Sequence, residues 1–319
     1  MSIIEIEGLH KRYGETIAVD GVDLSIDDGE IFGILGPNGA GKTTTVECLI
    51  GLRRPDQGRI RVLGLDPRSD GAALRRQVGA QLQESHLPDA LRVGEALGLY
   101  AAFYTSPTDP DQLLHDLGLT EKATTAFQDL SGGQQQRLSI ALALVGDPRI
   151  AVLDELTTGL DPSARRETWR LIEQVRDSGV TVVLVTHSMD EAERLCDRIA
   201  IIDRGRVVAT DTPAGLIGHV EATAQLRVRT VPPLTPDALA DLSEVREVTS
   251  EGEELVVRGD GDILHAVTKR IHALGAMAVA ARLGKATLED AFLALTGRSE
   301  LPDDLRAGGR IPGVEEAGV

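Results

Sequence analysis

Two hydrophobic patterns along the first two thirds of the chain predict two kinds of β-strand. Apolar and polar residues alternate over residues 3–7 and 22–26, which is typical of strands with one face in solvent. Residues 30–35 and 180–185 are nearly continuous apolar runs, as expected for strands buried on both faces. Shorter runs that also fit strands cover residues 59–62, 150–153, 199–202 and 206–209.

Helical patterns separate these runs. Residues 42–50 follow a glycine-rich loop, and residues 88–145 repeatedly place apolar side chains three or four positions apart. Strands separated by helices predict an α/β domain with a largely parallel sheet. We expect residues 88–145 to form a helical subdomain inserted into that domain.

Three short signals mark where helices should begin and end. Asp161 and Pro162 have the residue types favoured at an N-cap and in a first helical turn, and Gly179 stands where a glycine after a helix is expected. Ser188 and Glu191 have the spacing of a capping box, which predicts another helix start.

The pattern changes after about residue 215. A ferredoxin-like order of strand, helix, two strands, helix and strand is expected at residues 225–230, 236–242, 244–248, 254–257, 263–274 and 276–280. Residues 287–295 add a helix. We therefore expect a first domain at residues 1–215 and a small α+β domain at residues 216–298. Residues 299–319 carry mainly Gly, Pro and charge and are expected to be a disordered tail.

The charge of the chain argues against a nucleic-acid partner. Its 50 acidic and 33 basic residues give a net charge of −17, which is spread evenly along the sequence. Nucleic-acid binding depends on Lys and Arg that neutralise phosphates. Because there is no apolar run of the ~20 residues that span a membrane, and no signal-peptide pattern, we expect a cytoplasmic chain. Cys48 and Cys196 are then expected to be free thiols.

A glycine-rich segment after residues 30–35 has the spacing of a phosphate-binding loop. It fits G-x-x-x-x-G-K-[ST] at every fixed position with Gly36, Pro37, Asn38, Gly39, Ala40, Gly41, Lys42 and Thr43. Glycines let backbone N–H groups surround the β- and γ-phosphates, and the following helix directs its positive end at them. Lys42 would supply a charge to the γ-phosphate and Thr43 a hydroxyl to Mg²⁺. The loop by itself fits kinases, GTPases, helicases and transport ATPases equally.

Acidic and histidine side chains follow two of the buried strands. Asp154 ends one strand and would bind Mg²⁺, and the adjacent Glu155 could polarise an attacking water. His187 follows residues 180–185, at the edge of the sheet where α/β folds bind ligands. It could contact the γ-phosphate or orient Glu155. Taken alone, each also fits a structural role, as a solvated acidic loop or a packed histidine.

A second phosphate-binding feature lies between the loop and the acidic strand. Ser131, Gly132, Gly133 and Gln134 precede a helical stretch, and Ser131 is placed to be its N-cap. The two glycines would expose N–H groups at the positive end of the helix. The chain therefore contains two places that favour phosphate.

In this order, these segments resemble the ATP-binding subunits of ABC transporters over about residues 1–215. GPNGAGKTT, LSGGQQQR and AVLDE match the Walker A, signature and Walker B motifs of that family. The resemblance implies a P-loop (RecA-like) ABC cassette with an inserted helical subdomain, followed here by the small α+β domain. It implies ATP and Mg²⁺ as cofactors and ATP hydrolysis as the reaction. It adds Thr44 to the ATP-binding loop and assigns residues 131–134 to the same nucleotide across a dimer interface.

The resemblance also assigns roles to scattered residues. Asp161 matches the D-loop and His187 the switch histidine. Gln83 matches the glutamine that senses Mg²⁺ and couples to the membrane partner, and Tyr13 the aromatic side chain that stacks on adenine. Leu156 departs from the family, which usually has Pro after the catalytic glutamate, and it frees one backbone angle there. The implied catalytic residues are Glu155, His187, Lys42 and Gln83, and the implied Mg²⁺ ligands are Thr43, Gln83 and Asp154.

The subfamily resemblance suggests a direction of transport. Residues 138–166, together with a small domain after the cassette, resemble bacterial exporters of the daunorubicin-resistance type. This implies efflux of a drug or another hydrophobic compound, powered by ATP-driven head-to-tail homodimerisation. It also implies a separate transmembrane permease as partner, a peripheral position on the cytoplasmic face of the membrane, and no nucleic acid.

Three other functions stay open at the level of sequence. Importer ATPases share every catalytic motif. Non-transport ABC ATPases of translation or DNA repair share the cassette, although this chain has one cassette and no sustained heptads. A module that binds ATP without turnover is disfavoured by the presence of both Glu155 and His187. His265 and His272 share a predicted helix face, but no third ligand completes a metal site.

Overall fold

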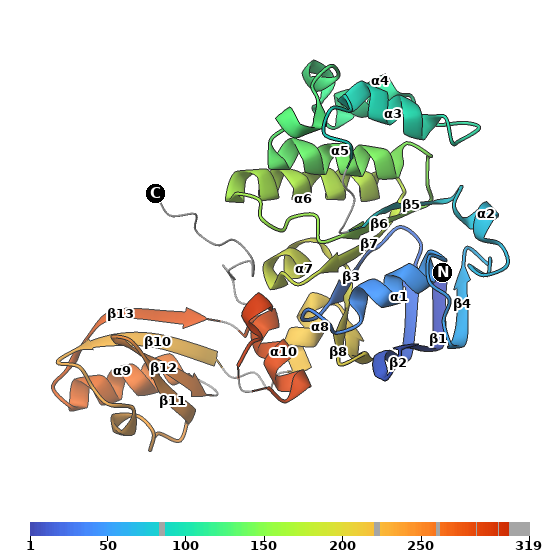
Figure 1. Ribbon diagram of the computed structural model, residues 1–319. Helices are drawn as coiled ribbons and strands as arrows, with labels where there is room; N and C mark the ends of the chain where they lie inside the picture. Colours follow the sequence, from blue (N-terminus) through green and yellow to red (C-terminus); the bar gives the residue numbers. More distant parts are fainter. Residues whose placement is uncertain (83–86, 220–223, 260–261, 285, 299, 306–319) are drawn as a thin grey trace. The chain divides into compact units, whose positions relative to one another are not determined.

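The computed structural model describes residues 1–82, 87–219, 224–259, 262–284, 286–298 and 300–305 (Figure 1). The chain separates into two compact units. The first combines Met1–Pro213 with Glu300–Val319, and the second is Ala214–Ser299. Residues 306–319, most of the expected disordered tail, lie outside the described residues, whereas residues 300–305 belong to the first unit.

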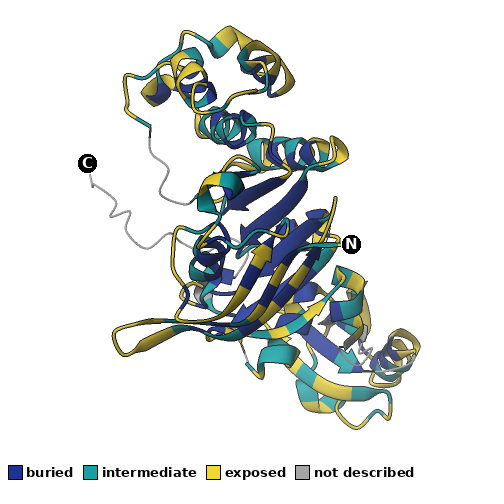
Figure 2. Ribbon diagram, turned by 90° about the vertical axis from the view of Figure 1, so that its right-hand side faces the viewer, coloured by how far each residue is buried: buried dark blue, intermediate teal, exposed yellow. Residues whose placement is uncertain are grey.

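A six-stranded sheet forms the centre of the first unit. Its strand order is β5-β6-β7-β3-β8-β9, and all neighbours are parallel except β8 and β9. The parallel strands are buried, as the continuous apolar runs predict (Figure 2). The largely parallel α/β sheet is thus confirmed, with strands β3 (Ile31–Leu35), β5 (Val78–Gln81), β6 (Ile150–Asp154), β7 (Thr181–Thr186), β8 (Arg198–Asp203) and β9 (Arg206–Asp211).

The alternating strands form a separate sheet. β1 (Ser2–Tyr13), β2 (Thr16–Asp27) and β4 (Gln57–Val62) pair antiparallel in the order β2-β1-β4. Their inward apolar residues, such as Ile4 and Leu24, share one core with Phe32 and Val183 of the parallel sheet. Alternation correctly indicates one exposed face, and burial of the other face against the parallel sheet accounts for the separation into two layers.

The helices of the first unit comprise the expected subdomain and four others. Residues 88–145 contain three α-helices and two 3₁₀ turns, at Thr120–Lys122 and Phe127–Asp129. The helices are α1 (Lys42–Leu49), α2 (Gly71–Leu74), α3 (Val93–Ala101), α4 (Pro110–Asp116), α5 (Gly132–Leu144), α6 (Pro162–Asp177) and α7 (Met189–Leu195). The order of strands and helices confirms the predicted fold class.

The local helix signals are mostly correct. The Asp161 carboxylate accepts hydrogen bonds from the N–H groups of Ser163 and Ala164, and Gly179 follows α6 with a φ of 96°. The Ser188 hydroxyl caps α7 by accepting from the Glu191 N–H. The capping-box prediction is wrong for the Glu191 side chain, which is fully buried and accepts other hydrogen bonds in the interior.

The second unit is built on a four-stranded antiparallel sheet with the order β11-β12-β10-β13. Leu226 and Val257 of the sheet pack against Ile263 and Val267 of α9. The helix predicted at residues 236–242 is wrong, because its backbone makes successive i→i−3 bonds and only a 3₁₀ turn, Pro236–Ala238, results. The elements are α8 (Pro213–His219), β10 (Ala224–Val231), β11 (Val245–Glu251), β12 (Glu254–Gly259), α9 (Ile263–Ala273), β13 (Met277–Gly284) and α10 (Leu288–Thr296).

Both cysteines are free, as predicted, and both are buried. Burial raises the pKa of Cys48 to about 11 and also raises the pKa of Cys196 well above its usual value. In the part of the chain that the structure describes, no helix is long and apolar enough to cross a membrane. The same residues contain no cluster of three or more His, Cys, Asp or Glu fit for a metal ion, and this includes His265 and His272.

Candidate functional site

The glycine-rich loop connects the central strand β3 to α1, the context that a phosphate-binding loop requires. At two of its glycines there is no room for a side chain. A Cβ on Gly36 would lie 2.1 Å from the Ile202 carbonyl oxygen, and one on Gly41 would lie 2.2 Å from that of Ala18, at a φ of 101°. The Gly205 N–H also donates to the Ala40 carbonyl at 2.9 Å. The backbone of the loop is thus held from outside by neighbouring main chain.

Lys42 is the first side chain of α1 and is buried, with 5 % of its surface exposed. Its Nζ donates to the carbonyl oxygens of Gly36 at 2.7 Å and Pro37 at 3.2 Å. Burial lowers the pKa of Lys42, whereas the carboxylates of Glu155 and Asp154 act in the opposite direction. A buried cation near two acids, at the open side of a phosphate-binding loop, is well placed to meet a polyanion.

Asp154 and Thr43 fit the Mg²⁺ ligands that their sequence positions predict. The Thr43 hydroxyl donates to Asp154 Oδ2 at 3.3 Å, while Asp154 Oδ1 is buried and has no hydrogen-bond partner among the residues that the structure describes. Burial raises the pKa of Asp154 to about 6, and the charge of Glu155 adds to this. A cation beside this oxygen would give Oδ1 a partner and would favour the ionised form of Asp154. Mg²⁺ fits this role, because it prefers oxygen ligands.

Glu155 and His187 come together as predicted. Glu155 Oε1 lies 3.2 Å from His187 Nδ1 and 3.9 Å from Lys42 Nζ. The hydrogen bond with His187 lowers the pKa of Glu155 against the effect of burial, and the same bond raises the pKa of His187. Glu155 is therefore an ionised carboxylate with a fixed orientation at neutral pH, which is the state a proton acceptor needs.

The backbone at Glu155 has a conformation that the sequence does not reveal. Its φ is 51°, in the left-handed region that non-glycine residues rarely adopt. The Glu155 N–H still donates to the Val185 carbonyl at 2.9 Å, so the residue remains attached to strand β7. The following Leu156 is fully buried. Strained residues of this kind concentrate at functional sites.

Tyr13 ends β1 and has 41 % of its surface exposed. The Nζ of Lys11 and the guanidinium of Arg53 each lie 5.7 Å from the centre of its ring. An exposed ring beside two cations is suited to stack on a nucleobase whose phosphates lie nearby.

Replacing Tyr13 with alanine is expected to weaken ATP binding by roughly tenfold, since one base–aromatic stack is worth about 1–3 kcal/mol. Tyr13→Phe keeps the ring and should bind like the wild-type chain. The dissociation constants, measured by calorimetry with a non-hydrolysable ATP analogue, check this. An alanine variant that binds as tightly as the phenylalanine variant would remove Tyr13 from the site.

The signature segment begins α5, and Ser131 is its N-cap, as predicted. The Ser131 hydroxyl accepts from the Gln134 N–H, and the Gln134 side chain returns a bond to the Ser131 N–H. Among the described residues, no hydrogen bond or ion pair joins residues 131–134 or Asp161 to residues 36–44. In the described part of the chain, the two phosphate-favouring features are thus not joined by a polar contact. Gln83 lies outside the described residues.

A buried polar cluster beside the acidic strand has no counterpart among the sequence predictions. The Thr157 hydroxyl and the Trp169 indole N–H both donate to Glu191 Oε1, at 2.8 Å and 3.1 Å. Glu191 is fully buried, and burial raises its pKa. The one signal in the sequence is that Trp169 is the sole tryptophan of the chain. The cluster links the segment after Glu155 to α6 and α7.

Glu191 is expected to make stability fall as the pH rises. Its folded-state pKa is raised above the ordinary 4.5, so the carboxyl is neutral in both the folded and the unfolded state at low pH. Above pH 4.5 the unfolded chain ionises first, which favours unfolding by about 1.4 kcal/mol for each pH unit until the buried carboxyl ionises too. Glu191→Gln should therefore gain stability relative to the wild type over that range. Thermal unfolding followed by Trp169 fluorescence checks this, and a pH-independent difference would contradict it.

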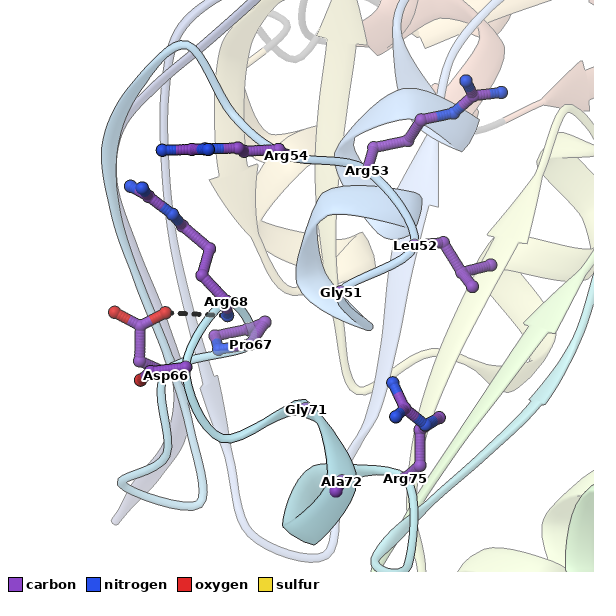
Figure 3. A pocket seen from close by; sticks show the side chains of 11 residues that line it. Gly51, Leu52, Arg53, Arg54, Asp66, Pro67, Arg68, Gly71, Ala72 and Arg75 are labelled. Carbon is purple, nitrogen blue, oxygen red and sulfur yellow. Dashed lines mark hydrogen bonds between the residues drawn. The ribbon is translucent and has the colours of Figure 1, made fainter.

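A surface hollow of about 770 Å³ is lined by a different set of residues (Figure 3). Arg54 and Arg68 both line it, and the Asp66 side chain accepts from the Arg68 N–H at 2.9 Å (Figure 3). Arg53 and Arg75 also line it. It contains no residue of the predicted nucleotide site, and it is a basic place on an acidic chain.

Known proteins resemble this chain either over most of its length or over the first part alone. Residues 19–158 match the family model described as ABC transporter. A protein of Ralstonia nicotianae named Nod factor export ATP-binding protein I is 38 % identical, covering 93 % of this chain and 94 % of its own length. The protein of the same name from Paraburkholderia xenovorans is 39 % identical, covering 92 % and 97 %.

Solved structures match the cassette part. An ATP-binding subunit of an ABC transporter is 28 % identical with a TM-score of 0.62, covering 68 % of this chain and 93 % of its own. The cbiO1 protein of Clostridium perfringens, part of the ABC transporter complex cbiONQ, is 29 % identical with a TM-score of 0.62, covering 69 % and 92 %. These matches and the site geometry agree. The chain therefore belongs to the ABC transporter family and is an ATP-binding subunit of such a transporter.

Proposed function

We propose that this chain hydrolyses ATP to drive export through a separate membrane permease. The direction of transport is supported by the share of this chain that each group of similar proteins covers. The solved cassettes account for 68 % and 69 % of this chain, whereas the relatives named for export account for 93 % and 92 %. The export relatives therefore share the second unit as well as the cassette. Because the relatives that match nearly the whole chain are named for export, this supports export over import and over non-transport roles.

The geometry supports a division of labour within the nucleotide site. Backbone N–H groups of residues 36–44 and the Lys42 ammonium hold the phosphates, and Tyr13 holds the adenine. Thr43 and Asp154 hold Mg²⁺, which neutralises charge on the β- and γ-phosphates when bound. Glu155 accepts the proton of the attacking water, and His187 keeps the Glu155 carboxylate ionised and oriented. Gln83 completes the set by resemblance to the family.

We propose that two copies pair head to tail when ATP binds. In one chain, residues 131–134 make no described contact with residues 36–44, although both favour phosphate. An ATP shared between the loop of one copy and the signature segment of another satisfies both, and its binding then stabilises the dimer alone. Asp161 lies at the start of α6, in the same motif order, and would face the partner copy. Loss of the γ-phosphate would release the pair.

The permease is proposed to place the chain at the cytoplasmic face of the membrane. The basic hollow around Arg54 and Arg68 offers an otherwise acidic chain a place for an acidic segment of that permease. The helical subdomain, residues 88–145, would transmit the motion of the cassettes. Residues 216–298 would stabilise the dimer or contact the permease. For the cargo we propose a drug or another hydrophobic compound, by resemblance to the daunorubicin-resistance type.

Co-purification and vesicle transport test this function. The tagged chain, extracted from its host in mild detergent, should retain a multispanning membrane protein and no nucleic acid. Inverted vesicles that contain both proteins should accumulate a hydrophobic fluorescent compound when ATP is added, and vesicles with Glu155→Gln should not. Accumulation only in right-side-out vesicles that have been loaded with ATP would favour an importer. A nucleic acid in place of the membrane protein would favour a role in translation or DNA repair.

A further inference from the structure

The last described segment of the chain returns to the first unit after the second unit has been completed. Residues 300–305 belong with Met1–Pro213, although Ala214–Ser299 separates them in sequence. Leu301 and Leu305 are buried, with 6 % and 4 % of their surfaces exposed. The short turn Asp303–Leu305 lies between these two anchors. The segment is therefore packed, and the side chain of Asp304 between these leucines is half-buried.

Asp304 of this segment contacts the phosphate-binding loop. The Asn38 N–H donates to Asp304 Oδ2 at 2.5 Å, across 266 positions of sequence. Asn38 lies between Pro37 and Gly39 in the middle of the loop. The Asp304 charge also reaches the residues proposed to act on the γ-phosphate. Burial lowers the pKa of Lys42, and Asp304 joins Glu155 and Asp154 in opposing that effect. The hydrogen bond to Glu155 raises the pKa of His187, and Asp304 acts in the same direction.

A carboxylate in this place imitates a phosphate oxygen. Both are anionic acceptors that suit a backbone N–H group in a glycine-rich loop, and charge-assisted bonds of this type are short. The loop has one set of N–H donors, so Asp304 and a nucleotide phosphate cannot both use that of Asn38. A second anion beside the triphosphate would also repel it.

We propose that residues 300–305 form an autoinhibitory strap whose Asp304 carboxylate occupies the phosphate-binding loop and is displaced when ATP binds. The inference rests on the proposed function, in which residues 36–44 hold the phosphates of ATP. The strap lowers the affinity of the resting chain for ATP. When ATP binds and displaces Asp304, the strap is released from the loop, so nucleotide binding directly frees residues 300–305.

The affinity of the full-length chain for the non-hydrolysable analogue AMP-PNP, with Mg²⁺, tests the proposal. Asp304→Ala should bind roughly tenfold more tightly than the wild type, the effect of one competing charge-assisted bond. Asp304→Asn keeps an acceptor without the charge and should lie between them. Glu121→Gln removes one negative charge from an exposed position and should bind like the wild type. Equal affinities for the wild type and Asp304→Ala, with at least roughly tenfold weaker binding by Lys42→Ala, would overturn the strap alone.

The same titration separates the two proposals. If Lys42→Ala binds AMP-PNP as well as the wild type does, or if neither binds it, the assignment of the loop as the nucleotide site is overturned, and the strap with it.

Hydrogen exchange gives a second, independent readout. Without nucleotide, the Asn38 N–H should exchange faster in Asp304→Ala than in the wild type, and AMP-PNP should protect it in both. In the wild type, AMP-PNP should increase exchange in residues 300–305, because the strap is released. Unchanged exchange in residues 300–305 at saturating AMP-PNP would overturn the proposal even if the affinities differ.

Discussion

Replacing Glu155 with glutamine is expected to lower the turnover of ATP at least about 100-fold while leaving ATP binding intact. A positioned general base contributes about 10²–10⁴ to a rate, and an amide cannot accept the proton of water. The change keeps the size and the buried position of the side chain, which has 9 % of its surface exposed. Steady-state phosphate release and calorimetric ATP binding check the two parts separately.

The same variant should accumulate as an ATP-bound dimer, because the shared nucleotide is no longer hydrolysed. Size-exclusion chromatography with and without ATP and Mg²⁺ measures this. Glu121→Gln, the same chemical change at an exposed position, should hydrolyse ATP and elute like the wild type. Wild-type turnover in Glu155→Gln would show that another group accepts the proton.

Replacing Lys42 with alanine is expected to weaken binding of AMP-PNP on the order of 100-fold, because a charge-assisted bond to phosphate is lost in a buried site. A second effect adds to this loss. The Lys42 ammonium is the donor to the Gly36 and Pro37 carbonyls, so its removal leaves both without that partner and loosens the loop. Binding is measured by calorimetry on the full chain.

The control for Lys42 is another lysine of this lysine-poor chain. Lys122 lies in the 3₁₀ turn Thr120–Lys122, and Lys122→Ala should bind AMP-PNP with wild-type affinity. Thermal unfolding of both variants shows whether the fold is retained. A folded Lys42→Ala chain with wild-type affinity would contradict the placement of the phosphates.

Local signals in the sequence predicted the parts of the site that depend on neighbouring residues. The loop, with Gly41 and Lys42, needs a strand before it and a helix after it, and the hydrophobic pattern shows both. Asp161 and Ser131 accept hydrogen bonds from N–H groups two or three residues further along the chain, so their capping roles are also local. The meeting of Glu155 with His187 could be expected because the carboxyl ends of parallel strands share one edge of a sheet.

Tertiary contacts decided the features that sequence could not predict. Glu191 has the spacing of a capping box, but burial beside Thr157 and Trp169 directs its side chain inward. The left-handed backbone conformation of Glu155 cannot be predicted from its residue type, because glycine is the residue that usually adopts this conformation. The contact of Asp304 with Asn38 joins residues 266 positions apart, and no periodic pattern encodes such a contact.

The state of the two cysteines makes this chain convenient for spectroscopy. Thiol labels react with the thiolate, and both Cys48 and Cys196 are buried with raised pKa values. A single cysteine introduced on the surface would therefore react selectively without removal of the native pair. Dyes or spin labels attached in this way can report the distance between two copies at each stage of the ATP cycle.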